Sequence, residues 1–99
     1  MKSEIESFLL GLGETSSEIR DNLLGRNIRG QRGSCWYCPI ANALTRTFNE
    51  DFLVTPSGAS TVIVGAVSHR LTLVLPEPCA DFVRDFDDGR YPELEVGNE

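Results

Sequence analysis

Histidine is nearly absent from this sequence, whose 99 residues contain a single one, His69. Nucleophilic catalysis of the Ser–His–Asp or Cys–His kind needs a histidine held beside its nucleophile, and His69 falls in a predicted turn. The acidic residues offer no substitute, because they gather on one predicted helix face without a recognisable partner. We therefore predict that the protein is not an enzyme.

Long apolar runs are also missing. The most apolar stretch, residues 60–75, is interrupted by Gly65 and Arg70 among others, whereas a membrane-spanning helix needs about 20 consecutive apolar residues. Near the start, Phe8-Leu9-Leu10 is too short for the apolar core of a signal peptide. These absences predict a soluble, cytoplasmic protein with no membrane partner.

The charge is negative overall but unevenly distributed, with a formal net charge of −6. Eight acids lie between Glu77 and Glu99 against two arginines, whereas residues 15–50 hold five arginines against three acids. Because an acidic protein repels nucleic acid on average, we predict that nucleic acid is not its partner.

Helix starts and ends can be read from capping signals. The capping boxes Ser3-x-x-Glu6 and Thr15-x-x-Glu18 each predict a short helix, and Gly25 stands where a C-terminal cap of the second helix belongs. Pro39 suits the first position of a third helix. Pro78 begins a fourth helix, which Gly89 closes. The core face of that last helix carries Cys79, Phe82, Val83 and Phe86.

Segments rich in Val, Ile, Leu and Thr predict three short strands in an antiparallel meander. They cover residues 52–55, 61–67 and 70–75. Pro56-Ser57-Gly58 marks the first turn, while the second turn falls at either Gly65-Ala66 or Ser68-His69. The predicted fold class is α+β, with two or three helices packed on the sheet, in the order α-α-α-β-β-β-α.

The chain is long enough for one compact domain. We expect residues 1–14 to form a short N-terminal helix and linker, residues 15–94 to form the compact α+β domain, and residues 95–99 to be a frayed tail.

Three cysteines, an odd number, favour thiols, a metal site or simple packing over a framework of disulfides. In one interpretation Cys35 and Cys38 are a thiol redox pair, because a helix N-terminus favours a thiolate; however, thioredoxin-like pairs follow a strand. In a second they bind zinc together with His69 and Cys79, although those two residues lie far apart. We rank both below a structural role in which Cys38 begins the third helix and faces the core.

The segment from Arg26 to Tyr37 is the main candidate for binding. Glycines let backbone N–H groups approach an anion that arginines then clamp; alternatively, Gly30 and Gly33 only permit positive φ, and the arginines are solvated or pair with the acidic C-terminal helix. Exposed Trp, Tyr and Arg dominate protein interfaces, although both aromatics could instead be buried. The candidate residues for a partner or an anion are Arg26, Arg29, Arg32, Ser34, Trp36 and Tyr37.

Two motifs carry a resemblance to a known group of proteins. They are Cys38-Pro39-Ile40-Ala41, which opens the third helix, and Phe82-Val83-Arg84-Asp85-Phe86-Asp87 followed by Gly89 and Tyr91-Pro92-Glu93-Leu94. Over roughly residues 19–94 the chain resembles small uncharacterised proteins of actinobacteria and their phages. The resemblance implies no activity. Its pattern keeps the cysteine that matches Cys38 and not the one that matches Cys35, which disfavours the redox and zinc interpretations.

These observations predict a small acidic accessory protein, of phage or mobile-element origin, that binds a cellular protein and needs no cofactor. The first alternative is the zinc or thiol redox protein described above. The second is a winged helix–turn–helix regulator of DNA, with helices at 16–24 and 39–49 before a hairpin wing. It is disfavoured because Arg46 is the one basic residue of the third helix.

Overall fold

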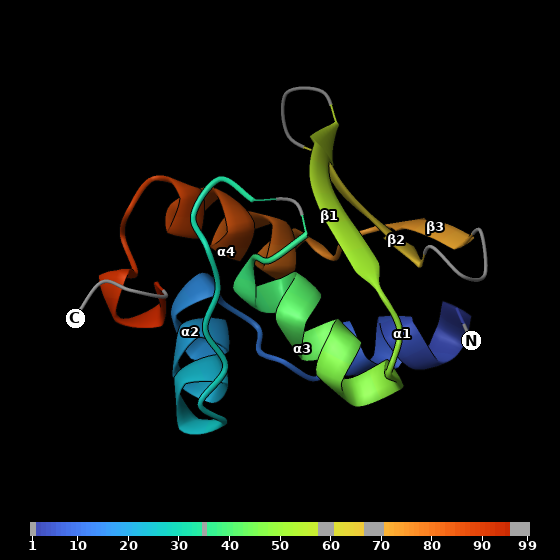
Figure 1. Ribbon diagram of the computed structural model, residues 1–99, viewed down its shortest axis with the longest axis horizontal. Helices are drawn as coiled ribbons and strands as arrows, with labels where there is room; N and C mark the ends of the chain where they lie inside the picture. Colours follow the sequence, from blue (N-terminus) through green and yellow to red (C-terminus); the bar gives the residue numbers. More distant parts are fainter. Residues whose placement is uncertain (1, 35, 58–60, 67–70, 96–99) are drawn as a thin grey trace.

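The computed structural model describes residues 2–34, 36–57, 61–66 and 71–95 (Figure 1). Its elements follow the order α-α-α-β-β-β-α, which confirms the predicted α+β fold. The elements are α1 (Lys2–Leu10), α2 (Ser16–Gly25), α3 (Pro39–Phe48), β1 (Phe52–Ser57), β2 (Thr61–Ala66), β3 (Leu71–Val74), α4 (Glu77–Asp87) and the 3-10 turn η2 (Pro92–Leu94). Among these helices, none has the length and apolar character needed to cross a bilayer.

Helix α2 starts as its capping box predicts and ends later than expected. The Thr15 hydroxyl accepts the Glu18 N–H (3.2 Å). At the other end Gly25 lies inside the helix, and Asn27 takes the left-handed conformation (φ 56°). The Ile28 N–H then donates to the Leu23 carbonyl (2.9 Å). This closure needs a left-handed residue, which asparagine tolerates, so the prediction of Gly25 as the cap was wrong.

Helix α4 ends in the same motif, here with glycine at the left-handed position as predicted. Gly89 has φ 82°, its N–H donates to the Phe86 carbonyl (3.0 Å), and the Arg90 N–H donates to the Asp85 carbonyl (3.0 Å). These bonds satisfy carbonyls that the helix itself leaves without a partner. The chain therefore turns back sharply after α4 and places the C-terminal residues against α2.

The sheet has the strand order β1-β2-β3, and both connections join antiparallel neighbours. Pro56 and Ser57, predicted in the first turn, belong to β1, where Pro56 pairs with Val62; proline is tolerated there because β1 is an edge strand. Gly65-Ala66 lies in β2 and is not the second turn. The other candidate for that turn, Ser68-His69, lies outside the described residues, as does Gly58.

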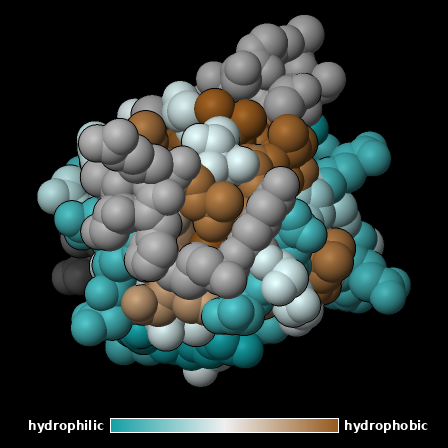
Figure 2. Space-filling view, turned by 90° about the vertical axis from the view of Figure 1, so that its right-hand side faces the viewer, coloured by the Kyte–Doolittle hydropathy of each residue, from teal (hydrophilic) through white to brown (hydrophobic). Residues whose placement is uncertain are grey.

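Helices cover one face of the sheet. On that face the side chains are buried, as at Val54, Val64 and Leu73, whereas on the other face Val74 is 62% exposed and Leu53 and Ile63 are half-buried. Figure 2 shows hydrophobic side chains gathered on the side of the molecule where the sheet lies. Apolar side chains with no helix above them therefore form part of the surface.

One core extends through all the helices. Helix α1 contributes Ile5 and Leu9, and Leu12 of the following segment is also buried, so α1 and this segment share the core of the rest of the described chain. The core is continuous across α1, α3 and β1 through edge-on and tilted contacts of aromatic rings. The rings belong to Phe8, Phe48 and Phe52.

The C-terminal segment folds back onto α2 and α4, as Figure 1 shows. Leu94 is fully buried, and the Tyr91 ring stacks on Phe82 with 5.4 Å between ring centroids. Ser16 donates from its hydroxyl to the Asp85 carboxylate (2.7 Å) and lies 2.5 Å from the Tyr91 hydroxyl, which therefore donates to it. These contacts hold the end of the described chain in place.

Candidate functional site

The loop of residues 26–38 runs from the end of α2 to the start of α3 and lies alongside α3. The Asn42 side chain donates to two loop carbonyls, those of Arg29 (2.6 Å) and Tyr37 (3.1 Å). One turn further along the helix, Arg46 Nη1 donates to the Arg26 carbonyl (3.2 Å). Residues at i and i+4 share a helix face, so one face of α3 holds the loop at both ends.

Hydrogen bonds within the loop fix its shape. The Gln31 N–H donates to the Tyr37 carbonyl (2.7 Å), and the Tyr37 N–H donates to the Ser34 hydroxyl (3.1 Å). On the far side, the Gly33 N–H donates to the Asp87 carboxylate (3.1 Å). The N–H groups of Gln31 and Gly33 belong to the run predicted to approach an anion, and both already have acceptors within the protein.

The C-terminal segment holds the loop from the side opposite α3. Gly30 forms a parallel bridge with Glu95, and its N–H donates to the Leu94 carbonyl (2.9 Å). Arg32 lies against the Glu95 carboxylate, with 3.9 Å between Nε and Oε1. Glu95, assigned from the sequence to a frayed tail, is therefore paired; residues 96–99 lie outside the described residues.

The two loop glycines have different roles. Gly33 has φ 77°, as predicted, whereas Gly30 is not in the left-handed region. A Cβ atom at Gly30 would lie against the Pro39 nitrogen, 2.5 Å from the Tyr37 carbonyl oxygen and 2.6 Å from the Cys38 carbonyl carbon. Only glycine allows two stretches of backbone to approach this closely. The prediction of positive φ was wrong for Gly30, whose role is to admit the start of α3.

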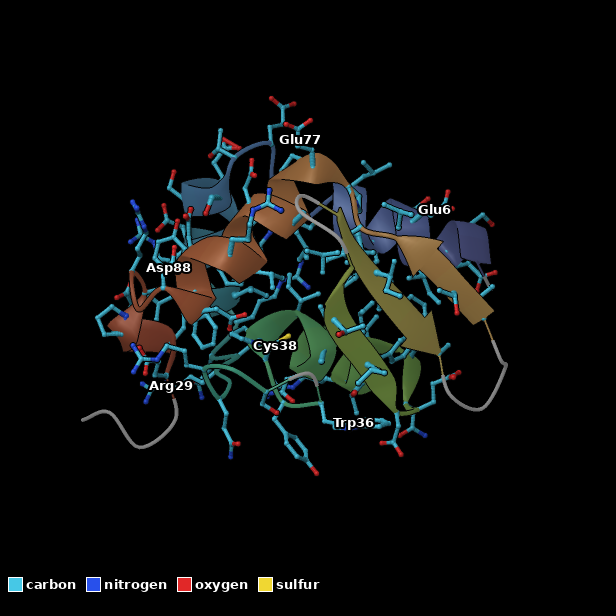
Figure 3. The ribbon with its side chains drawn as sticks, turned by 90° about the horizontal axis from the view of Figure 1, so that it is seen from above. Glu6, Arg29, Trp36, Cys38, Glu77 and Asp88 are labelled. Atoms are coloured by element: carbon cyan, nitrogen blue, oxygen red, sulfur yellow. The ribbon has the colours of Figure 1, made fainter. Side chains whose placement is uncertain are left out.

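The predicted binding residues do not meet at one point. Figure 3 shows Arg29 near the C-terminal end of the molecule and Trp36 well away from it. Arg26 lies over the Phe8 ring, 5.9 Å from its centroid, while Arg32 is at Glu95. Trp36 is 47% exposed and Tyr37 60% exposed, so the alternative that both are buried is wrong. Ser34 supports the loop by accepting the Tyr37 N–H.

Cys38 is the N-terminal cap of α3, and its buried sulfur accepts the Ala41 N–H (3.4 Å). The predicted placement of Cys38 at the helix start, facing the core, is confirmed. Its two neighbours in the redox and zinc hypotheses, Cys35 and His69, lie outside the described residues. Within residues 2–34, 36–57, 61–66 and 71–95, no three metal-ligating side chains cluster.

Cys79 lies in α4 at zero exposure, and its thiol donates to the Leu9 carbonyl (3.4 Å). Burial raises the pKa of the Cys79 thiol from 9.0 to about 12, because a thiolate loses its hydration there. Zinc binds the thiolate. Cys79 therefore behaves as a small core side chain, which argues against it as a fourth ligand.

We expect Cys79 to resist alkylation in the folded protein. A pKa of about 12 instead of 9.0 leaves about a thousandfold less thiolate near neutral pH. Mass spectrometry after iodoacetamide treatment should find Cys79 unlabelled in native protein and labelled in urea, and labelling at equal rates would contradict the burial. Because the pKa is raised on folding, the thiol stabilises the fold below about pH 9, and this contribution falls as the pH rises towards 12.

Asn42 is the site residue that sequence analysis missed. Its position on the solvent side of α3 indicated only exposure, yet the side chain bonds to the loop before and after Trp36, at Arg29 and Tyr37. The usable signal was its residue type, since asparagine is poor in helix interiors and often bonds to nearby backbone.

The spacing of α2 and α3 bears on the DNA-binding alternative. Residues 26–38 separate these helices, whereas a helix–turn–helix joins its two helices by a turn of about three to four residues. The basic side chain on α3 is Arg46, which already bonds to the Arg26 carbonyl. The arrangement therefore disfavours this alternative.

Comparison with protein-family models, with curated proteins and with solved structures finds no match. The geometry defines a small α+β domain with a hydrogen-bonded loop that exposes two aromatic side chains.

Proposed function

We propose that this protein is a non-enzymatic accessory protein that binds a partner protein through Trp36 and Tyr37. The observation that carries the proposal is the exposure of these two aromatic side chains, 47% for Trp36 and 60% for Tyr37. The Tyr37 backbone beside them is bonded, through its N–H to Ser34 of the loop and through its C=O to Asn42 of α3. Trp and Tyr are among the side chains that dominate binding energy at interfaces.

The fixed backbone matters for affinity. Ordering a loop on binding costs free energy that reduces affinity, and a loop already held in its bound shape avoids that cost. Here Tyr37 is held through both its N–H, which Ser34 accepts, and its carbonyl, which Gln31 and Asn42 bond. The aromatic pair therefore has the properties of a preformed anchor.

We also propose where the protein comes from and where it acts. The resemblance at Cys38-Pro39-Ile40-Ala41 and at the C-terminal motif supports a phage or mobile-element protein, and such a protein would act on a cellular partner in the cytoplasm. The proposal uses no metal, cofactor or catalytic group.

Alanine at Trp36 or Tyr37 is expected to weaken partner binding at least tenfold, since hot-spot truncations cost about 2 kcal/mol or more. The assay is quantitative mass spectrometry of proteins retained by each variant, beside its melting temperature. Leu10→Ala is the matched control, because Leu10 is 64% exposed on α1. Undiminished recovery of the same partner by Trp36→Ala and Tyr37→Ala would contradict the proposal.

A further inference from the structure

Hydrogen bonds join the loop to one face of α3. We call this region the α3 stripe and define it by Trp36, Tyr37, Asn42, Arg46 and Arg26. Asn42 bonds to the Tyr37 carbonyl at one end. Arg46, one helical turn along, bonds to the Arg26 carbonyl at the other. The stripe therefore has an aromatic end and a basic end, joined along one helix face.

The basic end stands out in a protein of net charge −6. Arg26 and Arg46 are both exposed, and in the part of the chain that the structure describes neither forms a salt bridge. By contrast, Arg20, Arg32 and Arg90 each lie against a carboxylate. Two guanidinium groups are thus available to an acidic ligand.

Their positions are fixed by other contacts. Arg46 donates one of its five N–H groups to the Arg26 carbonyl. Arg26 rests over the Phe8 ring, which is attractive for a cation. A guanidinium that is already placed loses less side-chain freedom when it binds a carboxylate, and such pairs are often bidentate.

The length of the stripe sets the spacing of a ligand. The aromatic end begins at Tyr37, beside Cys38, the N-cap of α3. From Cys38 to Arg46 the helix advances about 12 Å, at about 1.5 Å per residue. An extended peptide covers that distance in about four residues, at about 3.3 Å each. An apolar side chain on the aromatic end and a carboxylate on the basic end would therefore be separated by about four positions.

We propose that the α3 stripe binds an extended segment of the partner protein in which an apolar or aromatic residue lies about four positions from an aspartate or glutamate. This inference rests on the proposed function and names the chemistry of its partner. A protein carboxylate is favoured over nucleic acid because the protein's overall negative charge opposes a polyanion, while two arginines match one or two acids.

The test is selection from a random library of peptides of roughly a dozen residues displayed on phage, with the purified full chain as bait. Selected peptides are then synthesised and titrated using the fluorescence of Trp36, the one tryptophan of the chain. We expect enrichment of the proposed spacing, and a loss of at least tenfold in affinity for the double variant Arg26→Gln, Arg46→Gln. Arg90→Gln, outside the stripe, is the matched control and should bind as the native chain does.

Four results would overturn the inference. Selected peptides that lack acids, or that bind the double variant equally well, would show that Arg26 and Arg46 do not contribute to binding and that the aromatic end alone is the binding site. Tighter binding of a single-stranded oligonucleotide of similar length than of the selected peptides would show that the ligand of the stripe is nucleic acid and not an acidic peptide. No enrichment at all would reject a peptide ligand, while the recovery assay with Trp36→Ala and Tyr37→Ala decides the proposed function separately.

Discussion

Phe82→Ala is expected to lower the free energy of unfolding by about 3–5 kcal/mol. The Phe82 side chain has no solvent exposure, and its ring stacks on Phe86 (6.2 Å between centroids) and on Tyr91 (5.4 Å). Alanine would remove the ring that joins α4 to the returning C-terminal segment and would leave a cavity that the backbone cannot fill. For a domain of this size, with a total stability of about 5–15 kcal/mol, that is a large fraction.

Urea unfolding followed by circular dichroism measures this loss. Leu10→Ala serves as the control, because Leu10 is largely exposed and its truncation should change stability by about 0.5 kcal/mol or less. A Phe82→Ala protein that unfolds at the urea concentration of the native protein would contradict the packing of α4 against Tyr91.

Gly30→Ala is expected to destabilise the protein by about 3 kcal/mol, the upper part of the range for overpacking. The added methyl group would meet backbone atoms of Tyr37 and Cys38 at 2.5 and 2.6 Å, and backbone cannot rotate away as a side chain can. Relief requires the loop to leave the start of α3 and to shift against Leu94, whose carbonyl accepts the Gly30 N–H on the opposite side. Partner binding through Trp36 should therefore be lost together with stability.

Gly25→Ala is the matched control for this prediction. A Cβ atom at Gly25 would meet nothing within 4 Å, and Gly25 is helical. Alanine there should stabilise the protein by about 0.5–1 kcal/mol, because glycine is the weaker helix former. Thermal unfolding of both variants decides the matter, and equal effects at the two glycines would show that the close approach at Gly30 does not exist.

The helices were predictable because their signals are local. Thr15 and Glu18 lie within one turn of each other, and the core residues of α4 follow one another at intervals of three or four positions, so each signal can be read from a short stretch of sequence. The ends of helices and strands were less predictable where two residues could take the same position, or where one residue suits two kinds of structure. Asn27 replaced Gly25 at the left-handed position, and Pro56 entered a strand because that strand lies at the edge.

The candidate site was predictable in composition and not in arrangement. The capping position of Cys38 follows from Pro39. Residue types made Trp36 and Tyr37 candidates for binding but left open whether they are exposed or buried, which the structure decides. The contacts that shape the loop join residues far apart in sequence, such as Gly30 with Leu94 and Arg32 with Glu95. No periodicity or cap links such positions, so the division of the arginines among three locations emerges only from the fold.

The most direct test of a preformed loop is NMR relaxation of the backbone amides of Gln31, Gly33 and Tyr37, each of which has a hydrogen-bond acceptor within the protein. We predict order parameters near those of α3, about 0.85, with slow hydrogen exchange at Gln31. Values below about 0.6 at these amides, with exchange as fast as in an unfolded chain, would contradict the account of Trp36 and Tyr37 as a rigid anchor.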